Sequence, residues 1–248
     1  MRTRLTTKGA IMPLGKNIRN AVYEYCNNHL PGQTWYENEF EFIEDADLRK
    51  RLVEEFQGIR FAYKLYEGIE AENENIVFEI RHQIFSYATI YEAVLHYVLY
   101  TYYADTSEFH DLQYHETLAK IDIPTEKRCR LEKELEHDGK GIVPMYKKER
   151  KKDDAQVRFD DKCKAAEKLG LLSSFVNKDG EEVDLTREII EIYGYRNAIH
   201  LVAELRKGIA YELDLSKRAY RRMRPFIDQI KERLQIDRKS IYSTRREG

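Results

Sequence analysis

Residues 84–103 form the longest apolar-rich stretch of the chain, and the helix expected around it, from about residue 76 to 103, contains neither Gly nor Pro. Its apolar side chains cover much of the circumference of a helix, which is typical of a helix at the centre of a bundle. A membrane-spanning helix would avoid ionisable residues such as Glu92 and His96 near its middle. The stretch therefore predicts a long buried core helix and no association with a membrane.

Three further segments repeat apolar residues at helical spacing. The first follows the acidic residues 44–47, the second starts near Asp184, and the third starts near Asp214 or Ser216 and contains Pro225. The chain has only 12 Gly and 5 Pro, and 35% of its residues are charged. This composition favours amphipathic helices over many short strands. We therefore expect an all-α fold built on a bundle of four main helices.

The positions of these helices define the expected domain organisation. Residues 1–43 are interpreted as an irregular N-terminal extension with a short strand at 35–42, and residues 241–248 as a tail. Residues 44–240 form the helical domain, with 104–183 inserted between the second and third main helices. Within the insertion we expect a short helix closed by Gly170, a turn at 177–180, and a solvated linker at 147–152.

The candidate site lies in the third main helix, in residues 195–201 with the sequence YRNAIHL. Arg196 and His200 are four residues apart, so a helix places both on one face. Histidine can move protons near neutral pH, and arginine stays charged and offers a planar fork to phosphate oxygens. Such a pair suits cleavage of RNA by its own 2′-hydroxyl, which needs no metal. The alternative is an Arg and a His with structural roles only.

The YRNAIHL motif and the helices around it resemble the HEPN superfamily. The resemblance extends over residues 44–103 and 184–238 as a pattern, and only the seven-residue motif is specific. It implies a HEPN-like bundle and a metal-independent endoribonuclease of bacterial antiphage defence or of a toxin–antitoxin system. Arg196 and His200 would be the catalytic pair, assisted by Asn197. The three residues between Arg196 and His200 are fewer than in the usual form of the family motif.

Further residues extend the candidate site. Glu92 resembles an acidic residue that many HEPN proteins carry on the second helix, although it could instead pair with His96 or with a tyrosine hydroxyl. The last helix is rich in basic residues, which could follow an RNA backbone or form a solvated face. The predicted RNA-binding residues are Tyr195, Arg218, Arg221 and Arg222.

No cofactor or metal is expected. The three cysteines form no CxxC pair, the acidic and histidine residues of 105–116 match no zinc-ligand spacing, and no nucleotide-binding motif occurs. The expected partners are RNA, a second copy of the chain, and an antitoxin or another defence component. The start of the sequence, residues 1–4, lacks the apolar run of a signal peptide, so a cytoplasmic protein is expected. The alternative function is a non-catalytic HEPN-like scaffold for dimerisation or partner binding.

Overall fold

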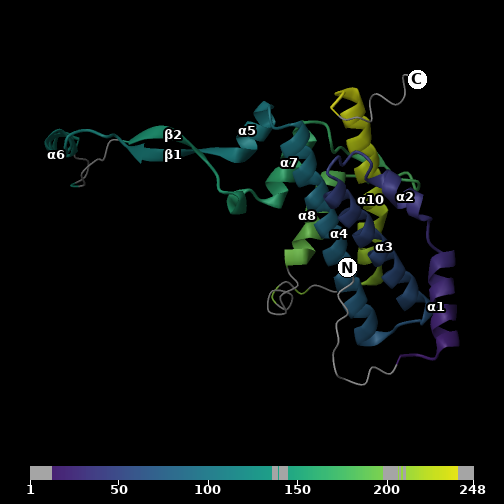
Figure 1. Ribbon diagram of the computed structural model, residues 1–248. Coiled ribbons are helices and arrows are strands. Elements are labelled where there is room, and N and C mark those ends of the chain that lie inside the picture. The colour runs from purple at the N-terminus through teal and green to yellow at the C-terminus, as the bar shows by residue number, and fades with distance from the viewer. Residues whose placement is uncertain are drawn as a thin grey trace. The chain divides into compact units, whose positions relative to one another are not determined.

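The computed structural model of the protein describes residues 13–135, 139, 145–197, 206, 208 and 211–239 (Figure 1). This part of the chain is mostly helical, in agreement with the predicted all-α class. It also holds two small antiparallel sheets. The helices are α1 (Lys16–Asn28), α2 (Gln33–Glu39), α3 (Ala46–Gly68), α4 (Asn73–Tyr102), α5 (Ser107–Gln113), α6 (Thr125–Glu134), α7 (Phe159–Lys168), α8 (Leu185–Asn197) and α10 (Leu213–Ile236), with the 3-10 turn η1 (Asp154–Gln156). The strands are β1 (Tyr114–Lys120), β2 (Met145–Lys151), β3 (Phe175–Val176) and β4 (Glu182–Val183).

Across the described ranges, no helix combines the length and the apolar character that a membrane crossing requires.

The chain divides into two compact units. The first contains residues 1–90 and 194–223, and the second contains residues 91–193 and 224–248. The boundaries fall inside α4, α8 and α10, so each of these helices contributes residues to both units. The predicted insertion at 104–183 belongs to the second unit.

The four predicted main helices are present as α3, α4, α8 and α10, and local signals set most of their ends. The Asp45 side chain caps α3 by accepting a hydrogen bond from the Leu48 amide at 2.9 Å. The Asp184 side chain accepts one from the Arg187 amide at 2.9 Å, at the start of α8. The prediction that Asp214 or Ser216 caps the last helix is wrong, because α10 begins at Leu213 and contains both residues.

From residue 13 onward the N-terminal segment is largely helical and not irregular, and the strand expected at 35–42 is wrong. Residues 16–28 and 33–39 form α1 and α2, and helical winding places Tyr36 beside Phe40, both fully buried. Phe56 of α3 is their common partner, at ring-centroid distances of 5.4 Å and 6.0 Å. Packing against α3 therefore overrides the apparent alternation of this segment.

The core of the first unit surrounds Phe56. Tyr87 of α4 and Tyr220 of α10 lie 6.3 Å and 6.4 Å from the Phe56 ring. The Arg60 guanidinium carbon is 3.8 Å from the centre of the Tyr220 ring, a cation–π contact at the edge of the cluster. Burial raises the pKa of Tyr36 to about 12, against an opposing effect of the Arg60 charge.

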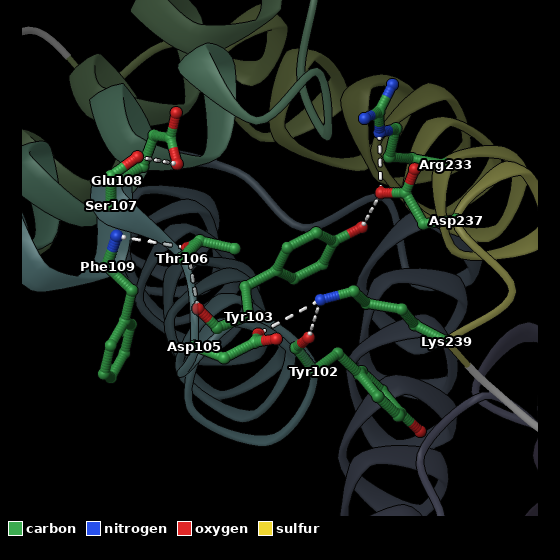
Figure 2. Close-up of polar contacts among 10 residues, drawn as sticks. All are labelled: Tyr102, Tyr103, Asp105, Thr106, Ser107, Glu108, Phe109, Arg233, Asp237 and Lys239. Atoms are coloured by element: carbon green, nitrogen blue, oxygen red, sulfur yellow. Dashed lines mark hydrogen bonds and ion pairs between the residues drawn. The ribbon is translucent and has the colours of Figure 1, made fainter.

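In the second unit, polar contacts join the last turn of α4 to the end of α10 (Figure 2). The buried Tyr103 hydroxyl donates to Asp237 Oδ2 at 2.8 Å, and Arg233 Nε donates to the same oxygen at 2.9 Å. Lys239 Nζ donates to the Tyr102 carbonyl at 2.7 Å. We call Tyr103, Arg233 and Asp237 the Asp237 cluster.

Residues 147–151 are not a linker, because they form most of β2. This strand pairs with β1, with Tyr114 opposite Lys151 and Lys120 opposite Met145. Every residue of β2 is exposed, and β1 has no fully buried residue. The local sequence, a run of charged residues, did not predict this strand, because its hydrogen-bonding partner lies about thirty residues earlier in the chain.

Two local turn predictions in the same region are confirmed. The short helix α7 ends at Lys168, and Gly170 follows with a positive φ of 73°. Asn177 Oδ1 accepts hydrogen bonds from the Asp179 and Glu181 amides at 2.9 Å, and Gly180 has a φ of 82°. This turn joins β3 to β4.

Candidate functional site

The first half of the YRNAIHL motif lies at the end of α8. Arg196 is half-buried, and its guanidinium carbon is 5.5 Å from the centre of the Phe85 ring. Asn197 is the last residue of the helix and is exposed. His200 lies outside the described residues. The structure therefore describes Arg196 and Asn197 within α8, and the pairing of Arg196 with His200 stays a prediction.

Glu92 has a tyrosine partner. The Tyr193 hydroxyl of α8 donates to Glu92 Oε1 at 3.1 Å. The His96 ring stacks on Tyr100 at 4.1 Å, and Lys162 Nζ is 3.4 Å from His96 Nδ1. The tyrosine hydroxyl was one of the alternative partners expected from the sequence, and this contact gives Glu92 a structural role in the second unit. Its catalytic role stays a prediction.

A surface pocket of about 280 Å³ lies beside the motif. Tyr195 of α8 and Arg218 of α10 both line it, so the structure brings together two of the four residues predicted to bind RNA. The other lining residues are Glu212, Asp214 and Leu215. The aromatic ring can stack on a base, and the guanidinium can bind a phosphate. The two carboxylates can accept hydrogen bonds from base amino groups.

The sequence analysis missed the acidic side of this pocket. Glu212 and Asp214 are exposed at the start of α10, where negative charge also stabilises the helix N-terminus. Asp214 was interpreted only as a helix cap. Asp214 stands four residues before Arg218, and a helix places such residues on one face. This spacing could have predicted that the two side chains lie together.

The other predicted RNA-binding residues, Arg221 and Arg222, follow Arg218 by about one turn of α10. Arg221 is exposed, whereas Arg218 and Arg222 are half-buried and already interact with other groups. Arg224, the next basic residue of this helix, pairs with Asp228 at 3.2 Å. The basic face of α10 is thus partly neutralised, and Arg221 is its most accessible member.

The geometry of the described site offers binding groups but no assembled catalytic pair. Among the residues that the structure describes, no group of three or more His, Cys, Asp or Glu side chains could hold a metal ion. Comparisons with protein-family models, with curated proteins and with solved structures found no match for this chain.

Proposed function

We propose that the protein is a metal-independent endoribonuclease of the HEPN type, with Arg196 and His200 as its catalytic pair. The observation that carries the proposal is the position of Arg196 in α8, directly after Tyr195, a lining residue of the pocket that also holds Arg218. Arg196 is half-buried, and its planar, permanently charged guanidinium suits phosphate binding.

In the proposed reaction, the 2′-hydroxyl of RNA attacks the adjacent phosphorus and the bond to the 5′-oxygen breaks. The products are a 2′,3′-cyclic phosphate and a 5′-hydroxyl end. His200 moves the protons, because an imidazole titrates close to neutral pH. Arg196 stabilises the negative charge on the phosphorane, and Asn197 orients the reacting groups.

The pocket beside the motif supplies a place for a nucleotide next to the cut. Tyr195 offers a stacking surface, and Arg218 offers a cation to a phosphate. The carboxylates of Glu212 and Asp214 disfavour a bare phosphate and can bind a base edge. A homodimer that brings two motifs together, acting in antiphage defence or with an antitoxin, is part of the same proposal.

The test is RNA cleavage by the purified protein in EDTA. We expect cleavage to cyclic-phosphate ends, and a loss of at least about a hundredfold for His200→Ala and for Arg196→Ala. Arg187→Ala is the matched control, because Arg187 is an exposed arginine on the same helix and should leave cleavage unchanged.

Two results would overturn the proposal. One is undiminished cleavage by His200→Ala, and the other is cleavage that EDTA abolishes. Stable protein without any cleavage would favour the scaffold function instead, in which Arg196 serves its contact with Phe85.

A further inference from the structure

The two faces of the β1–β2 hairpin differ in charge. Residues opposite each other in an antiparallel pair share a face, and alternate residues along a strand do so too. One face therefore holds both acidic residues of the hairpin, Glu116 and Glu149, which are paired with each other in the register. The other face has no acidic residue. We call it the acid-free face, and it consists of His115, Thr117, Ala119, Tyr146, Lys148 and Arg150.

Ion pairing strengthens this difference. On the acidic face, Lys147 Nζ lies 2.7 Å from Glu116 Oε2, and His110 Nε2 of α5 lies 3.6 Å from Glu149 Oε1. Lys148 and Arg150 are exposed, and neither forms an ion pair with any residue in the described ranges. Among the described residues, these two cations thus have no carboxylate partner, although the whole chain has a formal net charge of −2.

An aromatic ring continues the row of cations. Tyr146, Lys148 and Arg150 are alternate residues of β2, so they stand about 6.8 Å apart along one face. Tyr146 is 47% exposed, and its cross-strand neighbour is the small Ala119. A stacking ring in line with two free cations is the pattern by which proteins hold a single strand, with bases on the aromatic and phosphates on the cations.

We propose that the acid-free face of the hairpin binds single-stranded RNA. Lys148 and Arg150 contact successive phosphates, and Tyr146 stacks on a base. A duplex fits less well, because its paired bases offer no free face to Tyr146. The choice of RNA over DNA rests on the proposed function, whereas the choice of a single strand rests on the hairpin alone. In this proposal the hairpin captures RNA, and the Arg196 motif cleaves it.

The test measures binding of the full chain to a short, mixed-sequence RNA strand by fluorescence anisotropy. The strand carries 2′-O-methyl groups, so it cannot be cut through its 2′-hydroxyls. Lys148→Ala/Arg150→Ala should weaken binding by about tenfold or more. It should also reduce the slope of log affinity against log salt by about 1.4, at about 0.7 per lost phosphate contact. Tyr146→Ala should weaken binding by about fivefold or more.

The matched control is Lys120→Ala/Lys151→Ala, which removes the same charge from the opposite face of the same hairpin. It also leaves the Glu116–Lys147 ion pair in place. Binding by this control should stay within about twofold of the unchanged protein. All variants should unfold at the same urea concentration as the unchanged protein, since the substituted side chains are exposed.

Equal losses in the two double variants would overturn the proposal, because they would show a general charge effect. Unchanged binding by Lys148→Ala/Arg150→Ala would overturn it too. We call binding face-dependent when this double variant weakens it and the Lys120→Ala/Lys151→Ala control does not. Tighter face-dependent binding of duplex RNA than of the single strand would also overturn the proposal. Tighter face-dependent binding of a DNA strand would overturn the choice of RNA. Face-dependent RNA binding without any cleavage of ordinary RNA would uphold this inference and count against the proposed nuclease alone.

Discussion

The tyrosines and the carboxylate of the helical core lie in a different environment from those of the β1–β2 hairpin. Tyr36, Tyr87 and Tyr103 are at most 2% exposed, whereas Tyr146 of the hairpin is 47% exposed. The Asp237 side chain, directly after α10, is 17% exposed and accepts two hydrogen bonds, whereas that of Glu116 on β1 is 64% exposed. The same residue types therefore carry different energetic consequences in the two regions.

Burial explains the difference. A polar group inside the helical units has lost its water and depends on its protein partners, so its removal destabilises the fold. An exposed charged pair on the hairpin keeps most of its hydration, so its formation changes stability little. The hairpin can therefore vary its side chains without unfolding, and the side chains that it presents remain available to a partner.

The largest expected effect is loss of stability in alkali. Burial raises the pKa of Tyr36 to about 12, and burial raises the pKa of Tyr87 and Tyr103 as well. An unfolded tyrosine loses its proton near pH 10, so above that pH the unfolded state binds fewer protons than the native state. The free energy of unfolding should fall from about pH 10 upward, by roughly 3 kcal/mol for Tyr36 once the pH exceeds its native pKa.

Urea unfolding at a series of pH values measures this effect. Tyr36→Phe should make the pH dependence shallower, while Tyr146→Phe in the hairpin should leave it unchanged. The same slope in Tyr36→Phe and in the unchanged protein would contradict the expected contribution of the buried hydroxyl.

A smaller effect is expected at the Asp237 cluster (Figure 2). Asp237→Ala removes the acceptor of the Tyr103 hydroxyl and of Arg233 Nε, and it leaves a phenol without a partner at a position that is 2% exposed. We expect a loss of about 2 kcal/mol in the free energy of unfolding, measured by urea titration at neutral pH. In a double-mutant cycle with Tyr103→Phe, the coupling should be about 1 kcal/mol. Additive effects of the two substitutions would show that the hydrogen bond contributes nothing.

The smallest effect is expected in the hairpin. Glu116→Ala removes the ion pair with Lys147, whose two side chains are 64% and 72% exposed. The urea midpoint should not change measurably, because solvent screens such a pair. A loss of unfolding free energy as large as that of Asp237→Ala would show that the hairpin is coupled to the stability of the helices. The contrast between the hairpin and the helices would then be wrong.

Local sequence signals predicted the elements whose ends are set by near neighbours. Asp45 and Asp184 bond to amides three residues later, and Gly170 ends α7 because a positive φ is easy for glycine. The same method failed at 35–42 and at 147–151. Tyr36 of α2 and Phe40 at the end of that helix pack against Phe56 of α3, and β2 exists through its pairing with β1. These are contacts between distant parts of the chain, which no local pattern reports.

The candidate site shows the same division. The sequence alone indicated the Arg196 motif and an RNA-binding role for Tyr195 and Arg218, because spacing on a helix is a local property. The structure added that Tyr195 and Arg218 share a pocket with Glu212 and Asp214. Only the cross-strand register could reveal that Lys148 and Arg150 stand on a face without acids.

The sequence by itself determined the helical class and the positions of the four main helices, since apolar periodicity and caps act over a few residues. The tertiary structure decided which side chains are buried, which share a pocket and which face of the hairpin each cation occupies. The physical reason is that burial and strand register depend on partners distant in the chain. Burial and register in turn decide how much a polar side chain contributes to the free energy of unfolding.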